Sequence, residues 1–255
     1  MIVFDKVGFS YGSRPVLKDV NFSIQADERV AILGESGEGK TTVLKLIMGL
    51  QKPDSGRIWI DGEDITDKSE PELRETRLKL SIVFQEGALF DSLNVKENVA
   101  FCLREYSRMS EKEIDQKVRE LLGRVGMEDA IDLMPEELSG GMHRRVAIVR
   151  SLAACEPKMF LYDEPTSGLD PVNAHNICSL ILDLSRDGRG FVIVTHKMMD
   201  AIKVADRFIF FKNGVVIFDG NEEDLIKTLV PEVLVFMSDL NFDFKSSMDV
   251  EKQEG

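Results

Sequence analysis

Alternating apolar and polar positions predict a small sheet at the start of the chain. Apolar residues alternate or cluster in three short segments, at 2–4, 7–9 and 20–24. Turn residues at 12–15 interrupt this pattern, so we expect short strands that pair as an antiparallel sheet. A further pair of strands is expected to bracket Ser55-Gly56, because residues 57–60 favour β structure.

Unbroken apolar runs predict the buried strands of a second sheet. Such runs occur at residues 30–33, 81–84, 158–163 and 191–195. A helical pattern over 174–184 separates the last two runs, which is typical of a parallel βαβ unit. The second sheet is therefore expected to be parallel, with helices in its crossover connections.

The middle of the chain changes to a helical periodicity. Apolar residues recur at spacings of four, three, one and three, with charged residues between them, at Ile114, Val118, Leu121, Leu122 and Val125. This spacing places them on one face of an amphipathic helix. The stretch 94–135 therefore predicts a helical subdomain inserted between two strands of the core, and we place its limits at about 94 and 157.

Charge and composition narrow the possible classes of protein. The chain has 255 residues, of which 43% are hydrophobic and 30% charged, which suits one large globular domain with an inserted subdomain. The formal net charge is 32 minus 45, or −13. No basic footprint for nucleic acid or an anionic membrane is apparent, so any membrane role is expected to require a protein partner.

The cysteines and the first residues point to a cytosolic protein. The three cysteines, Cys102, Cys155 and Cys178, show no paired or metal-binding spacing and are expected to be reduced core residues. The N-terminal segment lacks the pattern of a secretory signal, and no apolar run approaches the roughly 18 residues that span a bilayer.

A glycine-rich segment between the first buried run and a helix predicts a phosphate-binding loop. It consists of Gly34, Glu35, Ser36, Gly37, Glu38, Gly39, Lys40, Thr41 and Thr42. Glycines let the backbone bend around a pyrophosphate with its N–H groups turned inward, and the following helix adds its positive dipole end. Lys40 is expected between the β- and γ-phosphates, and Thr41 is expected to offer its hydroxyl to Mg²⁺.

Two carboxylates close the buried run at 159–162. Asp163 and Glu164 fall at the carboxyl end of a predicted parallel strand, where α/β sheets hold their ligands. Asp163 is suited to position Mg²⁺ through water, and Glu164 to polarise the water that attacks the γ-phosphate. A plain acidic turn before Pro165 is the alternative, but a phosphate loop in the same chain favours the catalytic interpretation.

Six ordered motifs resemble those of an ABC transporter ATPase subunit. They are the loop 34–42, Gln85, 138–142, 162–165, 167–170 and His196. The resemblance covers roughly residues 2–226 and leaves 227–255 as a C-terminal extension, whose end from about 241 we expect to fray. It implies an α/β P-loop NTPase core with an antiparallel β subdomain and an inserted α-helical subdomain, and ATP and Mg²⁺ as ligands.

The resemblance also implies roles for single residues. Tyr11 would stack on adenine, Gln85 would reach Mg²⁺ and the attacking water, and His196 would hold the γ-phosphate. In the family, the signature residues Ser139, Gly140 and Gly141 contact a γ-phosphate that is bound by a second subunit. The chain has one phosphate loop and one signature, so two copies are expected to enclose two ATP molecules.

A second, narrower resemblance concerns the kind of transporter. Residues 87–95, 97–101 and Met134-Pro135 are similar to the ATPases of Mla-type lipid transporters. This implies an integral membrane permease, a lipid-binding MCE-domain partner, an accessory cytoplasmic protein, and a position on the cytoplasmic face of an inner membrane. The apolar loop Ala88-Leu89-Phe90 is suited to receive a short helix of the permease. The ATPase of a solute-importing ABC transporter is the alternative.

Three other classes fit the motifs less well. A ribosome-acting ABC protein would carry two cassettes, and a DNA-repair ATPase would carry a long coiled-coil insertion between its phosphate loop and its paired carboxylates. A P-loop kinase or GTPase would lack the segment 138–141 altogether.

Overall fold

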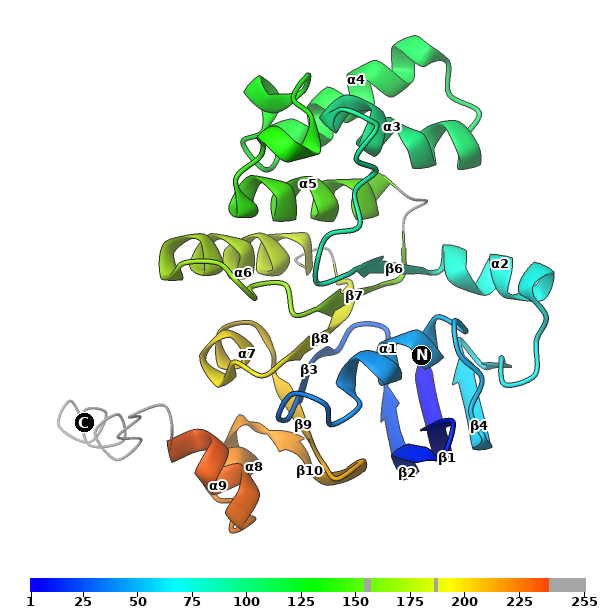
Figure 1. Cartoon of the computed structure of the whole chain (residues 1–255), viewed down its shortest axis with the longest axis vertical. Coiled ribbons are helices and arrows are strands. Elements are labelled where there is room, and N and C mark those ends of the chain that lie inside the picture. Colours follow the sequence, from blue (N-terminus) through cyan, green and yellow to red (C-terminus); the bar gives the residue numbers. More distant parts are fainter. Residues whose placement is uncertain (154–156, 186–187, 239–255) are drawn as a thin grey trace, which may run out of the picture.

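Two sheets organise the computed structural model, which describes residues 1–153, 157–185 and 188–238 (Figure 1). The first has the strand order β2-β1-β4-β5 and is antiparallel, with β1 at Ile2–Tyr11, β2 at Arg14–Ile24, β4 at Ser55–Ile60 and β5 at Glu63–Asp64. The predicted antiparallel sheet is therefore present.

Two details of this sheet differ from the sequence-based expectation. Residues 2–4 and 7–9 belong to the single strand β1, whose register shifts on both sides of Val7 instead of breaking. Ser55 and Gly56 lie inside β4 and are not bracketed by two strands. Glycine at position 56 allows the strand to continue through this point. Its backbone is left-handed, and a Cβ there would lie 2.3 Å from the carbonyl oxygen of Lys6 on β1. Glycine permits two strands to approach that closely.

The second sheet has the strand order β10-β9-β3-β8-β7-β6. Its strands are β3 at Arg29–Leu33, β6 at Leu80–Val83, β7 at Met159–Asp163, β8 at Gly190–Thr195, β9 at Arg207–Lys212 and β10 at Val215–Asn221. All pairs are parallel except the β9-β10 hairpin. As predicted, β7 and β8 are parallel neighbours joined through a helix, α6 at Pro171–Ser185. The strand β6 ends at Val83, one residue before the expected limit.

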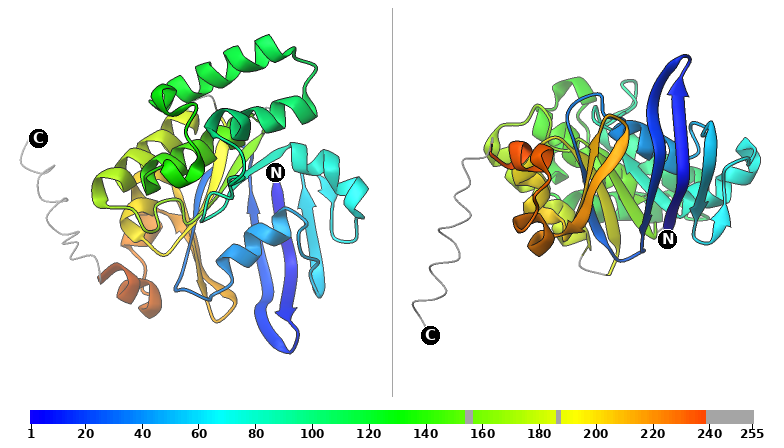
Figure 2. Two further views of the ribbon diagram at one scale, coloured as in Figure 1. Left: turned by 45° about the horizontal axis from the view of Figure 1, so that its top comes forward. Right: turned by 90° about the horizontal axis from the view of Figure 1, so that it is seen from below.

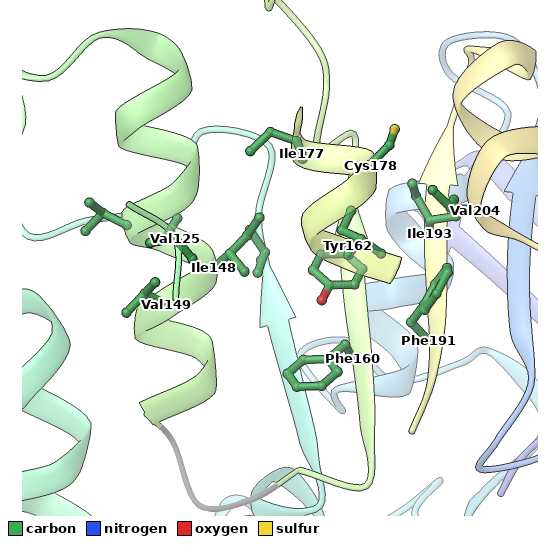
Figure 3. Close-up of a cluster of buried hydrophobic side chains, with 14 of the residues drawn as sticks. Val125, Ile148, Val149, Phe160, Tyr162, Ile177, Cys178, Phe191, Ile193 and Val204 are labelled. Atoms are coloured by element: carbon green, nitrogen blue, oxygen red, sulfur yellow. The ribbon is translucent and has the colours of Figure 1, made fainter. Parts of the chain in front are cut away.

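Alternate residues of this second sheet face two different cores. Val30 and Ile32 of β3 pack with the antiparallel sheet and with α1 at Lys40–Ile47. Ala31 and Leu33 face the opposite side, which is covered by helices. Figure 3 shows this second core, where side chains of β7 and β8 meet those of α6 and of α5 at Gly140–Ala153. The alternation explains why nearly every residue of the central strands is apolar.

The helical part of the chain packs through α5 against α6 and β6 (Figure 2, left). It contains α3 at Val95–Tyr106, α4 at Glu111–Gly123, two 3₁₀ turns at Glu128–Ala130 and Pro135–Glu137, and α5. Four of the five residues of the predicted apolar face lie on α4 and are at most 3% exposed, whereas the fifth, Val125, follows the end of the helix and is 8% exposed. A capping box between Ser110 and Glu113 fixes where α4 begins.

The remaining helices of the described residues pack against strands of the second sheet. They are α2 at Glu70–Leu78, α7 at Met198–Val204, α8 at Glu222–Ile226 and α9 at Pro231–Ser238. Within the described residues, no helix combines the length and the apolar character that crossing a membrane requires. Cys178 is buried as expected, Cys102 is only partly buried, and Cys155 and the tail from 241 lie outside the described residues.

Candidate nucleotide-binding site

The glycine-rich loop connects the central strand β3 to α1, as its sequence predicts. Gly34, Gly37 and Gly39 have positive φ angles of 150°, 89° and 93°, so the loop folds back over the start of the helix. A Cβ on Gly34 would lie 2.6 Å from the carbonyl oxygen of Phe211. Glycine is needed there for close packing and at Gly37 and Gly39 for the left-handed turn. The curved backbone and the N-terminus of α1 form a cradle suited to an anion.

The side chain of Lys40 reaches back to the first residues of this loop. This side chain is buried, and its ammonium donates hydrogen bonds to the carbonyl oxygens of Gly34, at 2.8 Å, and Glu35, at 2.9 Å. Burial lowers the pKa of Lys40, while the charges of nearby carboxylates, chiefly Glu164 and then Asp163, oppose that shift. A buried cation held by backbone carbonyls can change partners readily when phosphate oxygens arrive.

Asp163 and Thr41 meet where β7 ends beside α1. The Thr41 hydroxyl donates a 2.9 Å hydrogen bond to Asp163 Oδ1, which brings together residues that lie 122 positions apart. Asp163 is 3% exposed, and this burial raises its pKa despite the bond from Thr41. A hydroxyl and a carboxylate side by side are oxygen ligands of the kind that Mg²⁺ takes together with waters and phosphate oxygens. The two residues therefore fit the predicted metal role.

Glu164 follows Asp163 with an unusual backbone. Its φ is +47°, a left-handed conformation that non-glycine residues rarely adopt, and its N–H donates to the Val194 carbonyl at 2.8 Å. The carboxylate contacts His196 Nδ1 through Oε1 at 2.8 Å and accepts a bond from Thr195 through Oε2 at 3.3 Å. Backbone strain of this kind commonly accompanies a functional position. Here it orients the carboxylate between the ends of β7 and β8.

A cavity of about 380 Å³ opens above the loop. Nine predicted residues line it, together with Arg14 and Val16: Tyr11, Ser36, Gly37, Gly39, Lys40, Thr41, Thr42, Gln85 and Glu164. Tyr11 is 45% exposed, so its ring is available to a ligand. Asp163 and His196 do not line the cavity directly, but they bond Thr41 and Glu164, which do. Arg14 and Val16 were not predicted as cavity residues. The sequence placed Arg14 in a turn and Val16 just after it, whereas both belong to the first part of β2.

The structure does not bring every predicted residue to this cavity. Gly34 shapes the loop from behind, and the carboxylates of Glu35 and Glu38 are directed to the β9-β10 hairpin, where Lys212 Nζ lies 2.8 Å from Glu35 Oε1. The hairpin was not predicted, although the Asn213-Gly214 pair between two apolar runs is a strong signal for one.

The signature residues lie at the beginning of α5, outside the cavity lining. Ser139 caps this helix through its carbonyl, which accepts a 2.8 Å bond from His143 N–H, and Gly141 packs against α6. A Cβ on Gly141 would lie 2.7 Å from Asn173 Oδ1 on α6. Ser139, Gly140 and Gly141 therefore do not line the phosphate cavity of their own chain, which agrees with a contact to another subunit.

The loop that follows Gln85 is fastened to the helical part by polar side chains. Arg144 donates to the Phe84 carbonyl at 3.0 Å, and Arg150 donates to the Ala88 carbonyl at 2.6 Å. Asn98, which is fully buried, bonds both the N–H and the carbonyl of Phe90. The sequence did not predict these anchors, since an arginine or asparagine on a helix carries no local sign of which backbone group it will bond, whether that group lies 8 or 62 positions away.

Comparisons with known proteins agree with this geometry. The model of a family described as ABC transporter matches residues 17–167. The chain is 37% identical to an intermembrane phospholipid transport system ATP-binding protein, MlaF, of Haemophilus influenzae, over 93% of this chain and 90% of the relative. It is 41% identical to the glutamine transport ATP-binding protein GlnQ of Escherichia coli, over 89% and 94%.

A plant relative and a solved structure extend the comparison. The chain is 38% identical to the chloroplastic protein TRIGALACTOSYLDIACYLGLYCEROL 3 of Arabidopsis thaliana, over 89% of this chain and 70% of the relative. The dimeric structure of an ATP-binding cassette in a post-hydrolysis state with ADP and Pi matches with a TM-score of 0.80 and 35% identity. It covers 87% of this chain and 98% of the other.

Proposed function

The chain belongs to the ABC transporter family, and we propose that its ATP hydrolysis powers the movement of phospholipid between envelope membranes. As an ATP-binding subunit of this family, it has the α/β fold, the ATPase activity and the ligands, ATP and Mg²⁺, that the sequence predicted. The cargo is the new element. Similarity to a phospholipid-transport ATPase along 93% of the chain carries this part of the proposal.

The catalytic assignment rests on the group of side chains at the ends of β3, β7 and β8. We assign Lys40 to the β- and γ-phosphates and Glu164 to the attacking water. We assign His196, whose Nδ1 lies 2.8 Å from the Glu164 carboxylate, to the γ-phosphate. Bound at Thr41, Asp163 and Gln85, Mg²⁺ would offset the charge of the phosphate oxygens. Tyr11, at the open side of the cavity, would stack on the adenine ring.

A second copy of the chain would complete each site. Ser139, Gly140 and Gly141 lie outside the cavity of their own chain, so their proposed contact with the γ-phosphate requires another subunit. The match to a dimeric cassette supports this arrangement. In the proposed domain division, residues 2–226 form the ATPase, with a helical subdomain at about 94–157, and 227–255 form a C-terminal extension.

A pair of exposed aromatic rings supports a membrane partner. Phe90, in the loop after Gln85, is 42% exposed, and its ring centroid lies 4.8 Å from that of Phe101 on α3, which is 40% exposed. Leu89 is buried and belongs to the core on the helical side of the sheet. We propose that the two rings receive a short helix of the permease, which would hold the chain on the cytoplasmic face of an inner membrane. An MCE-domain protein and an accessory cytoplasmic protein complete the proposed complex.

A solute importer is the second candidate function. The observation in its favour is the 41% identity to the glutamine transport ATPase, which is slightly higher than the identity to the phospholipid-transport ATPase. The proposed ATP site and docking loop would serve either transporter, so only the partners and the cargo distinguish the two.

Purification of the tagged chain from its own membranes tests the proposal. Mass spectrometry of the gently solubilised complex should find a permease, an MCE-domain protein and bound phospholipid. A periplasmic solute-binding protein in place of these would refute the lipid assignment. Phe90→Ser should reduce recovery of the permease, whereas the control Val172→Ser, at a 70% exposed position on α6, should not.

A further inference from the structure

The phosphate loop carries two carboxylates beside the place where a triphosphate is expected. Glu35 and Glu38 are both part of the loop, and Glu38 directly precedes Gly39, at which α1 is capped. The charge of Glu38 acts on Lys40, since it opposes the lowering of that residue's pKa. An uncompensated negative charge within the phosphate loop would also repel the phosphate groups of a bound nucleotide.

A tight hairpin brings a cation to these two carboxylates. Lys212 pairs with Val215 across the two-residue turn Asn213-Gly214, whose φ angles of 53° and 78° are both positive, as in a type I′ turn. Lys212 Nζ lies 2.8 Å from Glu35 Oε1 and 3.7 Å from Glu38 Oε1.

The turn itself holds the second carboxylate. The backbone N–H of Asn213 donates a hydrogen bond to Glu38 Oε2, so Glu38 is bound by a lysine and by a peptide group at once. Its side chain is only 14% exposed, whereas that of Glu35 is 66% exposed. Solvent therefore screens the charge of Glu38 less than that of Glu35.

Packing fixes the hairpin against the rest of the site. Lys18 N–H donates to the Gly214 carbonyl at 2.8 Å, and a Cβ on Gly214 would lie 2.3 Å from the Val16 carbonyl oxygen. Val16 also lines the cavity and borders Gly39. The hairpin, β2 and the phosphate loop thus form one contiguous unit, which keeps the backbone of Lys212 beside the loop carboxylates.

We propose that Lys212 is a positioning residue, whose single positive charge bridges Glu35 and Glu38, offsets part of their charge and so holds the phosphate loop in the form that accepts ATP. This inference rests on the proposed roles of the loop residues and adds a residue 172 positions from Lys40 to the site. The carboxylates raise the pKa of Lys212, with Glu35 contributing most and Glu232 of α9 contributing as well, so the lysine is protonated when nucleotide binds.

The test compares Lys212→Met with Lys212→Arg and with Lys227→Met. Lys227, the residue after α8, pairs with Glu223 at 3.5 Å, and its side chain is 74% exposed, so its replacement removes an equal charge that is paired with Glu223 instead of the loop carboxylates. Lys212→Met should raise the Kd of ATP and the KM roughly three- to ten-fold at low salt, with kcat nearly unchanged. Lys212→Arg and Lys227→Met should match the unmodified protein.

Two further readouts separate charge compensation from a general loss of structure. Combining Lys212→Met with Glu38→Gln should restore most of the ATP affinity, and 0.5 M salt should shrink the effect of Lys212→Met alone. In nucleotide-free protein, hydrogen exchange of the amides at 34–40 should be faster in Lys212→Met than in Lys227→Met.

Opposite results would overturn the inference. An unchanged Kd in Lys212→Met, or a raised Kd that neither salt nor Glu38→Gln corrects, would remove Lys212 from this role. These results leave the ATPase assignment intact, because they are measured relative to a protein that binds ATP. Failure of the unmodified protein to bind ATP would instead refute the assigned roles of the loop residues themselves.

Discussion

Glu164 shows how much a single position determines at this site. Its left-handed backbone, its bond to Val194 and its contacts with Thr195 and His196 all orient one carboxylate. The partners of Glu164 in these contacts come from β8 and the residue after it, about 30 positions further along the chain. The side chain is therefore placed by the sheet edge, and changing its chemistry need not change its position.

Glu164→Gln should separate binding from turnover. Glutamine has nearly the same shape, so we expect ATP affinity within about threefold of the original and hydrolysis slower by roughly 10²- to 10⁴-fold, because an amide cannot accept the proton of the water. Equilibrium binding of a fluorescent ATP analogue and phosphate release measure the two effects. Glu223→Gln on α8 is the control, and appreciable remaining turnover in Glu164→Gln would exclude Glu164 as the base.

Tyr162, directly before the two carboxylates, has a buried hydroxyl group that lacks a hydrogen-bond partner among the described residues. Its ring is fully buried between Phe160 and Phe191 (Figure 3). Burial raises the pKa of this phenol, so the group is neutral but unsatisfied. A buried polar atom without a partner destabilises the folded state.

Tyr162→Phe should therefore stabilise the protein, by roughly 1 kcal/mol in the free energy of unfolding. Urea unfolding of both proteins measures the difference. Tyr106→Phe, at a 46% exposed ring on α3, should change stability by less than about 0.5 kcal/mol. A loss of stability in Tyr162→Phe would show that the hydroxyl does have a partner in solution.

At the scale of elements, α5 and the loop after Gln85 depend on each other. His143 of α5 lies against Gly87, where a Cβ would come within 2.9 Å of the imidazole. Burial lowers the pKa of His143, the positive charges of Arg144 and Arg150 lower it further, and Asp91 opposes them. The imidazole therefore packs in its neutral form.

This packing predicts a pH effect on stability. Because the folded-state pKa of His143 is below its ordinary value of 6.5, the unfolded chain binds more protons near that pH, and stability is lost as the pH falls below it. The melting temperature should fall more steeply between pH 7.5 and 5.5 in the unmodified protein than in His143→Asn. Equal slopes would contradict the assignment, and scans at both pH values measure them.

Local pattern predicted the elements that carry the site, but not the contacts between distant ones. The strand before the phosphate loop, the loop and the carboxylates after β7 follow from apolar runs and glycines that are adjacent in sequence. The bulged strand β1 was predicted as two strands, because bulges appear only when the partner strand is known. Lys212 and Arg150 gain their roles from tertiary packing, which periodicity does not encode.

At the scale of the whole molecule, the proposed site is built from two separate parts of the chain. The phosphate cavity lies at the edge of the central sheet, and the signature lies at the start of α5, in the helical part of the chain. Under the proposed arrangement, a chain contributes the cavity to one ATP and the signature to another.

Mixing two inactive variants tests that division. Lys40→Ala should weaken the cavity, and Ser139→Glu should place a negative charge against the partner's γ-phosphate. Each alone should lose ATP-dependent dimers in light scattering and most hydrolysis. In a mixed dimer, one site combines Lys40 of one chain with Ser139 of the other, so mixing should restore part of both signals. No restoration would contradict a site shared between chains.

The position of β3 in the middle of its sheet has a consequence for the newly made chain. Its sheet neighbours, β8 and β9, begin only at residues 190 and 207, far downstream of the phosphate loop. At about 5–20 residues per second, a ribosome needs roughly 10–30 seconds to make that interval. During that time the apolar strand has been made but has neither neighbour, so it is open to binding by chaperones, and the phosphate loop, although translated early, is among the last parts of the nucleotide site to assemble.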